Sequence, residues 1–317
     1  LDEQVALGHR RLAIIDPGPA ADQPMSSADG RLVLVFNGEI YNHVELAREL
    51  AAAGCAFRTR CDTEVILHAY ATWGDDCVRR FNGMWAFALW DRQQRRLLCS
   101  RDRLGVKPFV HATHQGRWWF SSEAPGLRAV LPLHRADAGK LHDFLAYGYR
   151  REDGHSFFAD VHELPPGHNL VLQDGRQQLQ RWWSLPEAVD AAAPAPRFEA
   201  RAEQLHALLT DAVRLRLRSD VPVALLQSGG LDSSAIAACV QAEIEAGRAG
   251  AFPIRAFTSV HPGHASDETA WVRALMRRLP RLQSIELQPP GDELAGQLAG
   301  YVKALQEPQA SAASFAH

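Results

Sequence analysis

A short run of glycine and hydroxyl residues in the second half of the chain has the composition of a phosphate-binding loop. It consists of Ser228, Gly229, Gly230, Leu231, Asp232, Ser233 and Ser234. Adjacent glycines let the backbone turn tightly and bring its N–H groups close to an anion. Ser233 and Ser234 would add hydroxyl donors in the first turn of a helix, where the macrodipole also favours negative charge. The segment therefore predicts a site for the phosphates of a nucleotide.

The carboxylate of Asp232 adds a second requirement to this site. It would repel phosphate unless a divalent cation bridges the two, so the loop implies Mg²⁺ with Asp232 as a candidate ligand. The sequence contains no Gly-rich loop ending in Gly-Lys-Ser or Gly-Lys-Thr, so this is not a Walker loop. The structural alternative is a Gly-Gly turn that precedes an ordinary capped helix.

The elements around the loop are predicted to form a parallel sheet. Apolar residues at helical spacing, among them Phe198, Leu205 and Val213, predict an amphipathic helix over 198–217. A short buried strand over 222–226, a helix over 232–246, a strand over 254–260 and a helix over 268–278 follow. Strands that alternate with helices at this spacing are typical of an α/β, doubly wound parallel sheet.

The first half of the chain has a different pattern, in which short apolar runs alternate with turn residues. The run 32–36 ends at Asn37-Gly38, which predicts a strand followed by a turn. Further strands are predicted over 85–90, 97–99, 118–120 and 170–172, and helices over 44–53 and 63–73. This mixture indicates a layered α+β domain over 1–189. The small and Pro-rich segment 190–197 is interpreted as a linker to a second domain over 198–317.

Composition limits the classes of protein to consider. The chain has 317 residues, 46% hydrophobic and 22% charged, with a formal net charge of −3. The lack of a basic excess argues against nucleic-acid binding, and no apolar run is long enough to span a bilayer. Five scattered cysteines without a Cys-x-x-Cys pair are typical of reduced thiols in a cytoplasmic protein. His111 and His114 are interpreted as solvated loop histidines and not as metal ligands.

The loop over 228–234 resembles the pyrophosphate-binding loop of the N-type ATP pyrophosphatases. These enzymes cleave ATP between its α and β phosphates and adenylate a substrate, so the resemblance implies ATP and Mg²⁺. Gln227 stands where the family usually has an apolar residue, next to the adenine. By the same resemblance Ser259 would lie at the other strand end that contacts adenine.

Segments of the first half resemble the class II glutamine amidotransferase domain of the asparagine synthetase family. They are residues 7–16, 36–42, 62–65, 81–88, 100–108, 122–123 and 164–168. The family joins this domain to an ATP pyrophosphatase domain in the order found here. The resemblance implies an Ntn-hydrolase-like αββα sandwich for the first domain and a PP-loop sheet for the second.

The resemblance also assigns a glutamine site. Arg11 would hold the α-carboxylate of glutamine, while Glu39 and Asp62 would hold its α-ammonium. The Asn37 side chain and the Gly38 N–H would form the oxyanion hole. Leu12, Ile14 and Ile15 are assigned to the same site. Taken singly, these residues have structural alternatives: a surface cation at Arg11, a hairpin turn at Asn37-Gly38 and a helix N-cap at Asp62.

The chain departs from the family at its amino terminus. The family's nucleophile is an amino-terminal cysteine, whereas this sequence starts at Leu1. Cys61 lies beside Asp62 and is interpreted as structural. A second ATP-site motif is also absent. We therefore expect a fragment that lacks the nucleophile and the carboxyl-terminal part of the synthetase domain, with little activity of its own.

The resemblance implies a glutamine-hydrolysing asparagine synthetase, cytoplasmic and homodimeric. Aspartate would be adenylated by ATP and amidated with ammonia from glutamine, releasing AMP, pyrophosphate and glutamate. One alternative is a related synthetase acting on another carboxylate, as in β-lactam synthetases, lasso-peptide cyclases or enzymes that amidate surface glycans. Another is a non-catalytic relative that binds glutamine.

Overall fold

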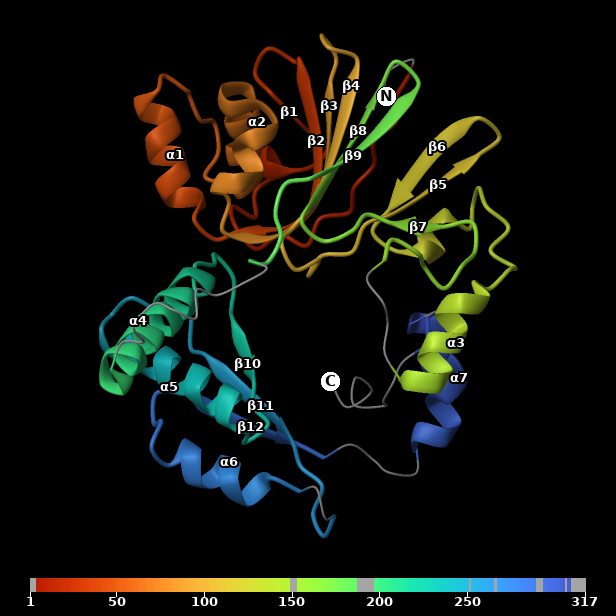
Figure 1. Cartoon of the computed structure of the whole chain (residues 1–317). Helices are drawn as coiled ribbons and strands as arrows, with labels where there is room; N and C mark the ends of the chain where they lie inside the picture. Colours follow the sequence, from red (N-terminus) through yellow and green to blue (C-terminus); the bar gives the residue numbers. More distant parts are fainter. Residues whose placement is uncertain are drawn as a thin grey trace. The chain divides into compact units, whose positions relative to one another are not determined.

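The computed structural model describes residues 4–148, 153–186, 197–250, 252–264, 267–288, 293–305 and 307–308. The chain divides into two compact units, over residues 1–187 and 188–317 (Figure 1). Residues 190–196 of the predicted linker lie outside the described residues, and Arg197 precedes the first helix of the second unit. The linker therefore stays a prediction.

The first unit is built on a six-stranded antiparallel sheet with the order β1-β2-β3-β4-β8-β9. Its strands are β1 (Met25–Ser26), β2 (Leu32–Ile40), β3 (Gly83–Asp91), β4 (Arg96–Arg101), β8 (His168–Gln173) and β9 (Arg176–Arg181). Helices α1 (His43–Ala52) and α2 (Asp62–Trp73) cover one face of this sheet (Figure 1). Leu34, Phe36, Trp85 and Phe87 point to that face and pack in the larger apolar core, because side chains alternate along a strand.

The opposite face of the sheet carries a second β layer. Val35, Ala86 and Cys99 pack there against Phe109 and Phe120. This layer is a small sheet of order β6-β5-β7, formed by β5 (Val110–His114), β6 (Arg117–Ser121) and β7 (His162–Glu163). The unit is thus a layered α+β structure, as predicted.

Short helices complete the first unit. The 3-10 helices are η1 (Pro19–Ala21), η2 (Gly74–Arg80) and η3 (Ala124–Leu127), and the remaining α-helix is α3 (Ala138–Tyr147). η3 packs on the small sheet through Ala124 and Leu127. Asp137 caps α3 by accepting a hydrogen bond from the Lys140 N–H at 2.8 Å.

The predicted turn at Asn37-Gly38 is wrong. β2 continues through both residues to Ile40, and they pair in register with Ala86 and Trp85 of β3. The Asn-Gly pair follows an apolar run, which is the usual hairpin pattern. Here Gly38 instead allows a close approach of two strands, because a Cβ built on it would lie 2.1 Å from the Met84 carbonyl oxygen.

The second unit contains a three-stranded parallel sheet, as predicted. The order is β10-β11-β12, with Leu226 paired to Phe257 and Phe257 paired to Ile285. Its elements are α4 (Phe198–Arg216), β10 (Ala224–Leu226), α5 (Leu231–Glu245), β11 (Arg255–Ser259), α6 (Thr269–Met276), β12 (Gln283–Leu287) and α7 (Glu293–Leu305). Within the described residues, α4, α5 and α6 contribute to one apolar cluster with the sheet, and the doubly wound arrangement stays a prediction.

Two expectations for this unit are corrected. The strand over 222–226 is not buried: β10 is an edge strand and Leu226 is 63% exposed. Only part of the predicted apolar face of α4 is packed, because Val213 is buried whereas Phe198 and Leu205 are exposed. Apolar spacing identified the helix but not how much of its length contacts the sheet.

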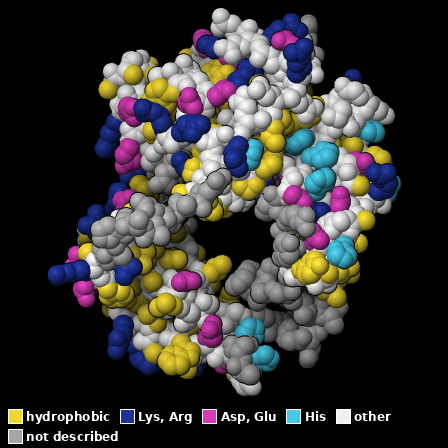
Figure 2. Space-filling model, in the orientation of Figure 1, with side chains coloured by type: hydrophobic (Ala, Val, Ile, Leu, Met, Phe, Trp, Pro, Cys, Tyr) yellow, Lys and Arg dark blue, Asp and Glu magenta, His cyan; other side chains and the backbone are white. Residues whose placement is uncertain are grey.

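The interpretation of His111 and His114 as solvated loop residues is also wrong, since both lie in β5. His111 lies in β5 and is half-buried, with its ring stacked on Trp118 at a centroid distance of 5.5 Å. The ring of His162 lies 5.7 Å away. Figure 2 shows histidine side chains gathered over the region of β5 and β7. Burial and the neighbouring His162 lower the pKa of His111 to about 4.

We expect His111→Phe to reduce the acid sensitivity of the fold. Folded His111 binds a proton less readily than in the unfolded chain, so the free energy of unfolding falls as the pH drops from 6.5 towards about 4. The effect is on the order of 2 kcal/mol, since each tenfold step is worth about 1.4 kcal/mol and partial exposure reduces the total. Urea denaturation at pH 7.5 and pH 4.5 measures it, with exposed His134→Phe as control. Equal acid sensitivity in both variants would contradict this role.

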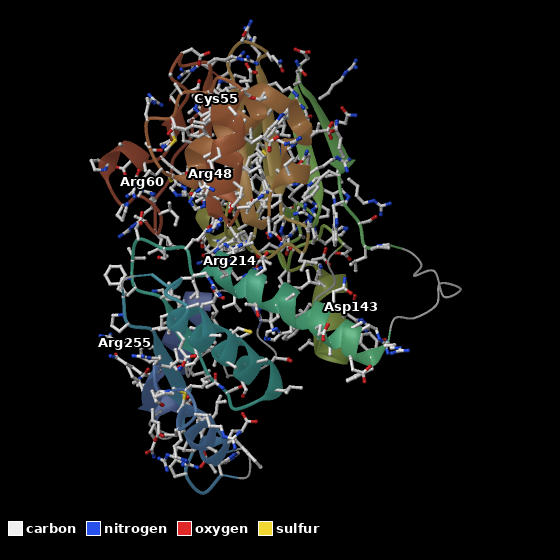
Figure 3. All side chains as sticks on the ribbon, turned by 90° about the vertical axis from the view of Figure 1, so that its left-hand side faces the viewer. Arg48, Cys55, Arg60, Asp143, Arg214 and Arg255 are labelled. Carbon is white, nitrogen blue, oxygen red and sulfur yellow. The ribbon has the colours of Figure 1, made fainter. Side chains whose placement is uncertain are left out.

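The five cysteines are free in the structure. Four of them are buried, and Cys55 lies in the connection between α1 and α2, where Figure 3 labels it. Across the described residues, we find no helix with the length and apolar character that a membrane crossing requires.

Candidate functional site

A cleft of about 1330 Å³ opens in the first unit. Its walls come from the amino-terminal segment, the middle of β2, the start of α2 and the β5–β6 hairpin. All eight residues assigned to the glutamine site line it, namely Arg11, Leu12, Ile14, Ile15, Asn37, Gly38, Glu39 and Asp62. The structure therefore brings together residues that are up to 51 positions apart in the sequence, since Arg11 and Asp62 share one cavity.

Hydrogen bonds from the terminal nitrogen Nη2 hold the guanidinium of Arg11 in place. Its Nη2 donates to the carbonyl oxygens of Ile15 at 2.5 Å and Asp16 at 2.9 Å. Its Nη1 is buried and has no hydrogen-bond partner among the residues that the structure describes. A buried unpaired donor on a cation is costly, because it has lost water without gaining another acceptor. Arg11 is therefore not a surface cation, and its free donor suits an anionic ligand.

Asp62 stands at the first position of α2 with its side chain turned to β2. Its carboxylate accepts from the Ile40 N–H at 2.9 Å and from the Cys61 thiol at 3.3 Å. The helix cap is Cys61, so Asp62 is not the N-cap that the structural alternative proposed. Burial raises the pKa of the Asp62 carboxyl above its usual range. Glu39 adds a second buried carboxylate to the same wall.

Cys61 behaves as a structural thiol. It is 1% exposed and packs in the core beneath the cleft. Burial and the neighbouring Asp62 raise the pKa of its thiol to about 11. Because the thiolate is the nucleophilic form, Cys61 is poorly suited to attack an amide.

The β2 backbone can present a donor to the cleft at Gly38. The N–H groups of Phe36 and Ile40 point away from β3, since they donate to the side chains of Gln23 and Asp62. N–H directions alternate along a strand, so the Gly38 N–H points to the same free edge. The Asn37 amide lies next to it and donates to the Ser122 hydroxyl at 3.4 Å. An amide and a backbone N–H at one edge can stabilise a developing oxyanion.

Gln23 is a cleft residue that the sequence analysis missed. Its Oε1 accepts from the Phe36 N–H at 2.6 Å, and its Nε2 donates to the Thr63 hydroxyl at 3.4 Å. It thereby closes the edge of β2 just before Asn37. Gln23 precedes a proline in a polar loop, and no spacing or motif distinguishes it from an ordinary loop residue.

The candidate phosphate loop, residues 228–234, lies between a strand and a helix of the second unit, as predicted. It connects β10 to the amino terminus of α5, and Gly229 adopts a φ of +87°. A Cβ built on Gly229 would lie 3.1 Å from Val272 and 3.3 Å from the Glu268 side chain. Glycine is thus required both by the backbone conformation and by the close approach of α6. Asp232 is exposed in the first turn of α5.

The loop hydroxyls are already linked to one another. The Ser228 Oγ accepts from the Gly230 N–H at 3.3 Å and lies 3.1 Å from the Ser233 Oγ. The Ser233 hydroxyl donates to the Gly230 carbonyl at 3.2 Å. Gln227, 3% exposed, reaches into this network from the end of β10. These contacts link Ser228, Gly230 and Ser233 to one another within the loop.

Residues at the next strand end have mainly structural contacts. The Ser259 Oγ lies 3.0 Å from the His261 Nε2. Asp267 accepts from the N–H groups of His261 and Thr269 just before α6. In the part of the chain that the structure describes, His, Cys, Asp and Glu side chains form no group of three or more that could hold a metal ion.

Comparison with known proteins identifies both units. The model of the glutamine amidotransferase domain family matches residues 1–183, and that of the asparagine synthase family matches residues 204–317. Glutamine-hydrolysing asparagine synthetase 3 of Bacillus subtilis is 36% identical over 247 residues, which are 77% of this chain and 39% of that protein. An amidase of Gibberella zeae is 32% identical over 78% of this chain and 36% of its own length. The chain therefore spans less than half the length of these relatives.

A solved structure also aligns with the chain. Glutamine phosphoribosylpyrophosphate amidotransferase of Bacillus subtilis, in complex with ADP and GMP, aligns with a TM-score of 0.41 and 17% identity. The alignment covers 75% of this chain and 49% of that chain.

Proposed function

Because the chain belongs to the glutamine-hydrolysing asparagine synthetase family, we propose that its first unit binds L-glutamine and its second unit binds Mg·ATP. In the whole protein, ammonia released from glutamine would amidate aspartate after adenylation of its side-chain carboxylate. We also propose the finer folds that accompany this function, an αββα sandwich and a doubly wound PP-loop sheet. The free cysteines support a reducing, cytoplasmic compartment.

The unpaired Nη1 of Arg11 is the observation that carries the glutamine proposal. A carboxylate at this position would accept from the free donor and neutralise the buried cation. Asp62 and Glu39 lie in the same cleft and can hold the α-ammonium of the ligand. A zwitterionic amino acid therefore matches the charges of the cleft at both of its ionised groups.

The side-chain amide of bound glutamine would then reach the Asn37 and Gly38 edge. We propose that the Asn37 Nδ2 and the Gly38 N–H donate to the carbonyl oxygen as it becomes an oxyanion. The strand fixes the Gly38 N–H and Ser122 contacts the Asn37 amide, so little reorganisation would accompany charge development. The family supplies the attacking thiolate from an amino-terminal cysteine, and the residues described here would bind, orient and polarise the amide.

In the second unit, the loop over 228–234 and the start of α5 would hold the ATP phosphates. The hydroxyls of Ser228 and Ser234 and the loop N–H groups supply donors, and Gly229 leaves room for close backbone approach. Asp232 would hold Mg²⁺, since its exposed carboxylate offers the oxygen ligands that this ion prefers and Mg²⁺ in such sites keeps few protein ligands. When bound, the ion would neutralise charge on the phosphates.

Product analysis tests the activity of the whole protein. The complete protein is incubated with ATP, Mg²⁺, glutamine and aspartate, and the products are identified by mass spectrometry. Equal amounts of asparagine, AMP and pyrophosphate are expected. Release of glutamate without asparagine would support glutamine hydrolysis by the first unit and would exclude aspartate as the acceptor. Absence of both products would contradict the proposal.

We expect Asp62→Asn to abolish glutamine binding without lowering stability at pH 7.5. Burial raises the pKa of the folded carboxyl, so its stabilising contribution is present at low pH and lost as the pH rises through that pKa. Asparagine keeps an acceptor for the Ile40 N–H but cannot hold an ammonium group. Calorimetric titration with L-glutamine and urea denaturation measure the two effects.

The ligand provides a control for this prediction. Glutaramic acid, which is glutamine without its α-ammonium, should bind the variant and the parent chain equally weakly. A variant that retains full glutamine affinity would contradict the assignment of Asp62.

A further inference from the structure

The Gln227 side chain forms an unusual link between the sheet and the phosphate loop. Its backbone N–H donates to the Phe257 carbonyl at 2.8 Å, which fixes the residue at the end of β10. Its Nε2 then lies 3.3 Å from the Ser233 Oγ and 3.4 Å from the Ser234 Oγ. The residue as a whole is 3% exposed. One buried amide group therefore contacts both hydroxyls of the first turn of α5.

The direction of these hydrogen bonds decides what the hydroxyls can offer a ligand. The amide nitrogen can only donate, so both serine oxygens act as acceptors towards Gln227. The Ser233 proton is used on the Gly230 carbonyl at 3.2 Å. The Ser234 oxygen receives its bond from Gln227. No described residue accepts the proton of the Ser234 hydroxyl, so this proton is available for an acceptor outside the protein. An oxygen in place of the amide nitrogen would take up that proton.

The same amide has a cost to the fold. Within the described part of the chain, its Oε1 is buried without a hydrogen-bond partner, and so is the Thr258 Oγ1 on the neighbouring strand. Leu226 pairs with Phe257, so Gln227 and Thr258 follow at the next position of the two strands. An apolar side chain at position 227 would leave no unpaired carbonyl. Packing alone therefore does not explain a glutamine here.

We propose that Gln227 is a positioning residue for the nucleotide: its amide group saturates the acceptor side of Ser233 and Ser234 and directs the Ser234 proton to a phosphate oxygen. The inference rests on the proposed binding of Mg·ATP by the second unit. Gln227 would thus increase the affinity for phosphate through the two serines, without contacting the phosphate itself.

Three variants and one probe test this proposal. We expect Gln227→Met, which keeps the side-chain length and removes the amide, to weaken Mg·ATP binding about fivefold to tenfold. Its thermal midpoint without nucleotide should stay the same or rise, since the unpaired carbonyl is gone. Gln227→Glu should weaken binding more, because its oxygens withdraw the hydroxyl protons. Ser234→Ala should weaken binding in the parent chain but add little to Gln227→Met.

Gln241→Leu is the matched control. Gln241 is a buried glutamine further along α5, where its Oε1 accepts from the Arg281 N–H at 3.0 Å. We expect this variant to lower the thermal midpoint while the Kd for Mg·ATP changes less than twofold. Gln227→Met should thus weaken Mg·ATP binding without lowering the thermal midpoint, whereas Gln241→Leu should lower the thermal midpoint without weakening binding.

The outcomes separate this inference from the function on which it rests. If the parent chain binds Mg·ATP and Gln227→Met binds it equally well, the positioning role is wrong and the proposed function stands. The positioning role is also wrong if Gln227→Met lowers both the thermal midpoint and the affinity for Mg·ATP, because the loss of affinity would then follow from a damaged fold. If the parent chain does not bind Mg·ATP at millimolar concentration, the proposed function of this unit fails and the inference fails with it.

Discussion

Arg11→Ala is expected to reduce the affinity for L-glutamine by at least about 100-fold. The variant removes a buried cationic donor of the cleft that has no partner among the described residues, and truncating one partner of a buried charged pair costs roughly 2–5 kcal/mol. Arg11→Lys should recover little of the affinity, because lysine keeps the charge but loses the planar fork. It also loses the bonds to the Ile15 and Asp16 carbonyls that orient the side chain.

Two controls show whether the loss is specific. Arg48→Ala removes an exposed arginine on α1, which Figure 3 labels, and should leave glutamine binding unchanged. 4-Aminobutanamide, which is glutamine without its α-carboxylate, should bind the parent chain weakly and be insensitive to Arg11→Ala. If Arg11→Ala weakens this analogue as much as glutamine, the residue acts through the fold and not on the carboxylate.

Gly38→Ala is expected to destabilise the first unit by more than about 4 kcal/mol, the range reached by severe backbone or packing conflicts. The added Cβ would lie 2.1 Å from the Met84 carbonyl oxygen and 2.7 Å from the Trp85 Cα, and these backbone atoms cannot move aside without breaking the β2–β3 pairing. The φ of +153° at Gly38 adds a conformational penalty for any L side chain. Soluble yield and urea denaturation measure the effect.

Substitutions at two other glycines separate the steric clash of the added Cβ from the penalty of the positive φ. Gly83→Ala creates a similar clash, 2.2 Å from the Glu39 carbonyl oxygen, without a positive φ. It should therefore cost less than Gly38→Ala but still be strongly destabilising. Gly18→Ala is the benign control, since its Cβ would meet only Asp16 at 3.6 Å and its φ is −68°. Gly38→Ala with the stability of the parent chain would contradict the strand geometry on which the oxyanion proposal depends.

The parts of the molecule that sequence could predict are those governed by local chemistry. The phosphate loop was predicted from two adjacent glycines between an apolar strand and a helix, and that arrangement is observed. Helix α2 was predicted over 63–73 and extends from Asp62 to Trp73. The glutamine-site residues came from the resemblance to the family, and they line one cleft.

The parts that sequence could not predict depend on partners distant along the chain. The role of Gly38 depends on the backbone at Met84, so the local Asn-Gly pattern gave a turn where a strand passes. Strand β9 is almost entirely polar and was not predicted, since it pairs at the edge of the sheet with β8. Gln23 has its role only because it closes the edge of β2. In each case tertiary pairing overrides the local pattern.

Hydrogen–deuterium exchange of this chain with and without L-glutamine tests the central claim most directly, because it locates the ligand. Binding in the cleft predicts slower exchange over residues 36–40, including the edge N–H of Gly38, and over residues 9–16 around Arg11. Exchange over the phosphate loop, 228–234, should stay unchanged with glutamine and slow down with Mg·ATP. Unchanged exchange at 36–40 at saturating glutamine, or protection confined to the second unit, would contradict the assignment of this cleft as the glutamine site.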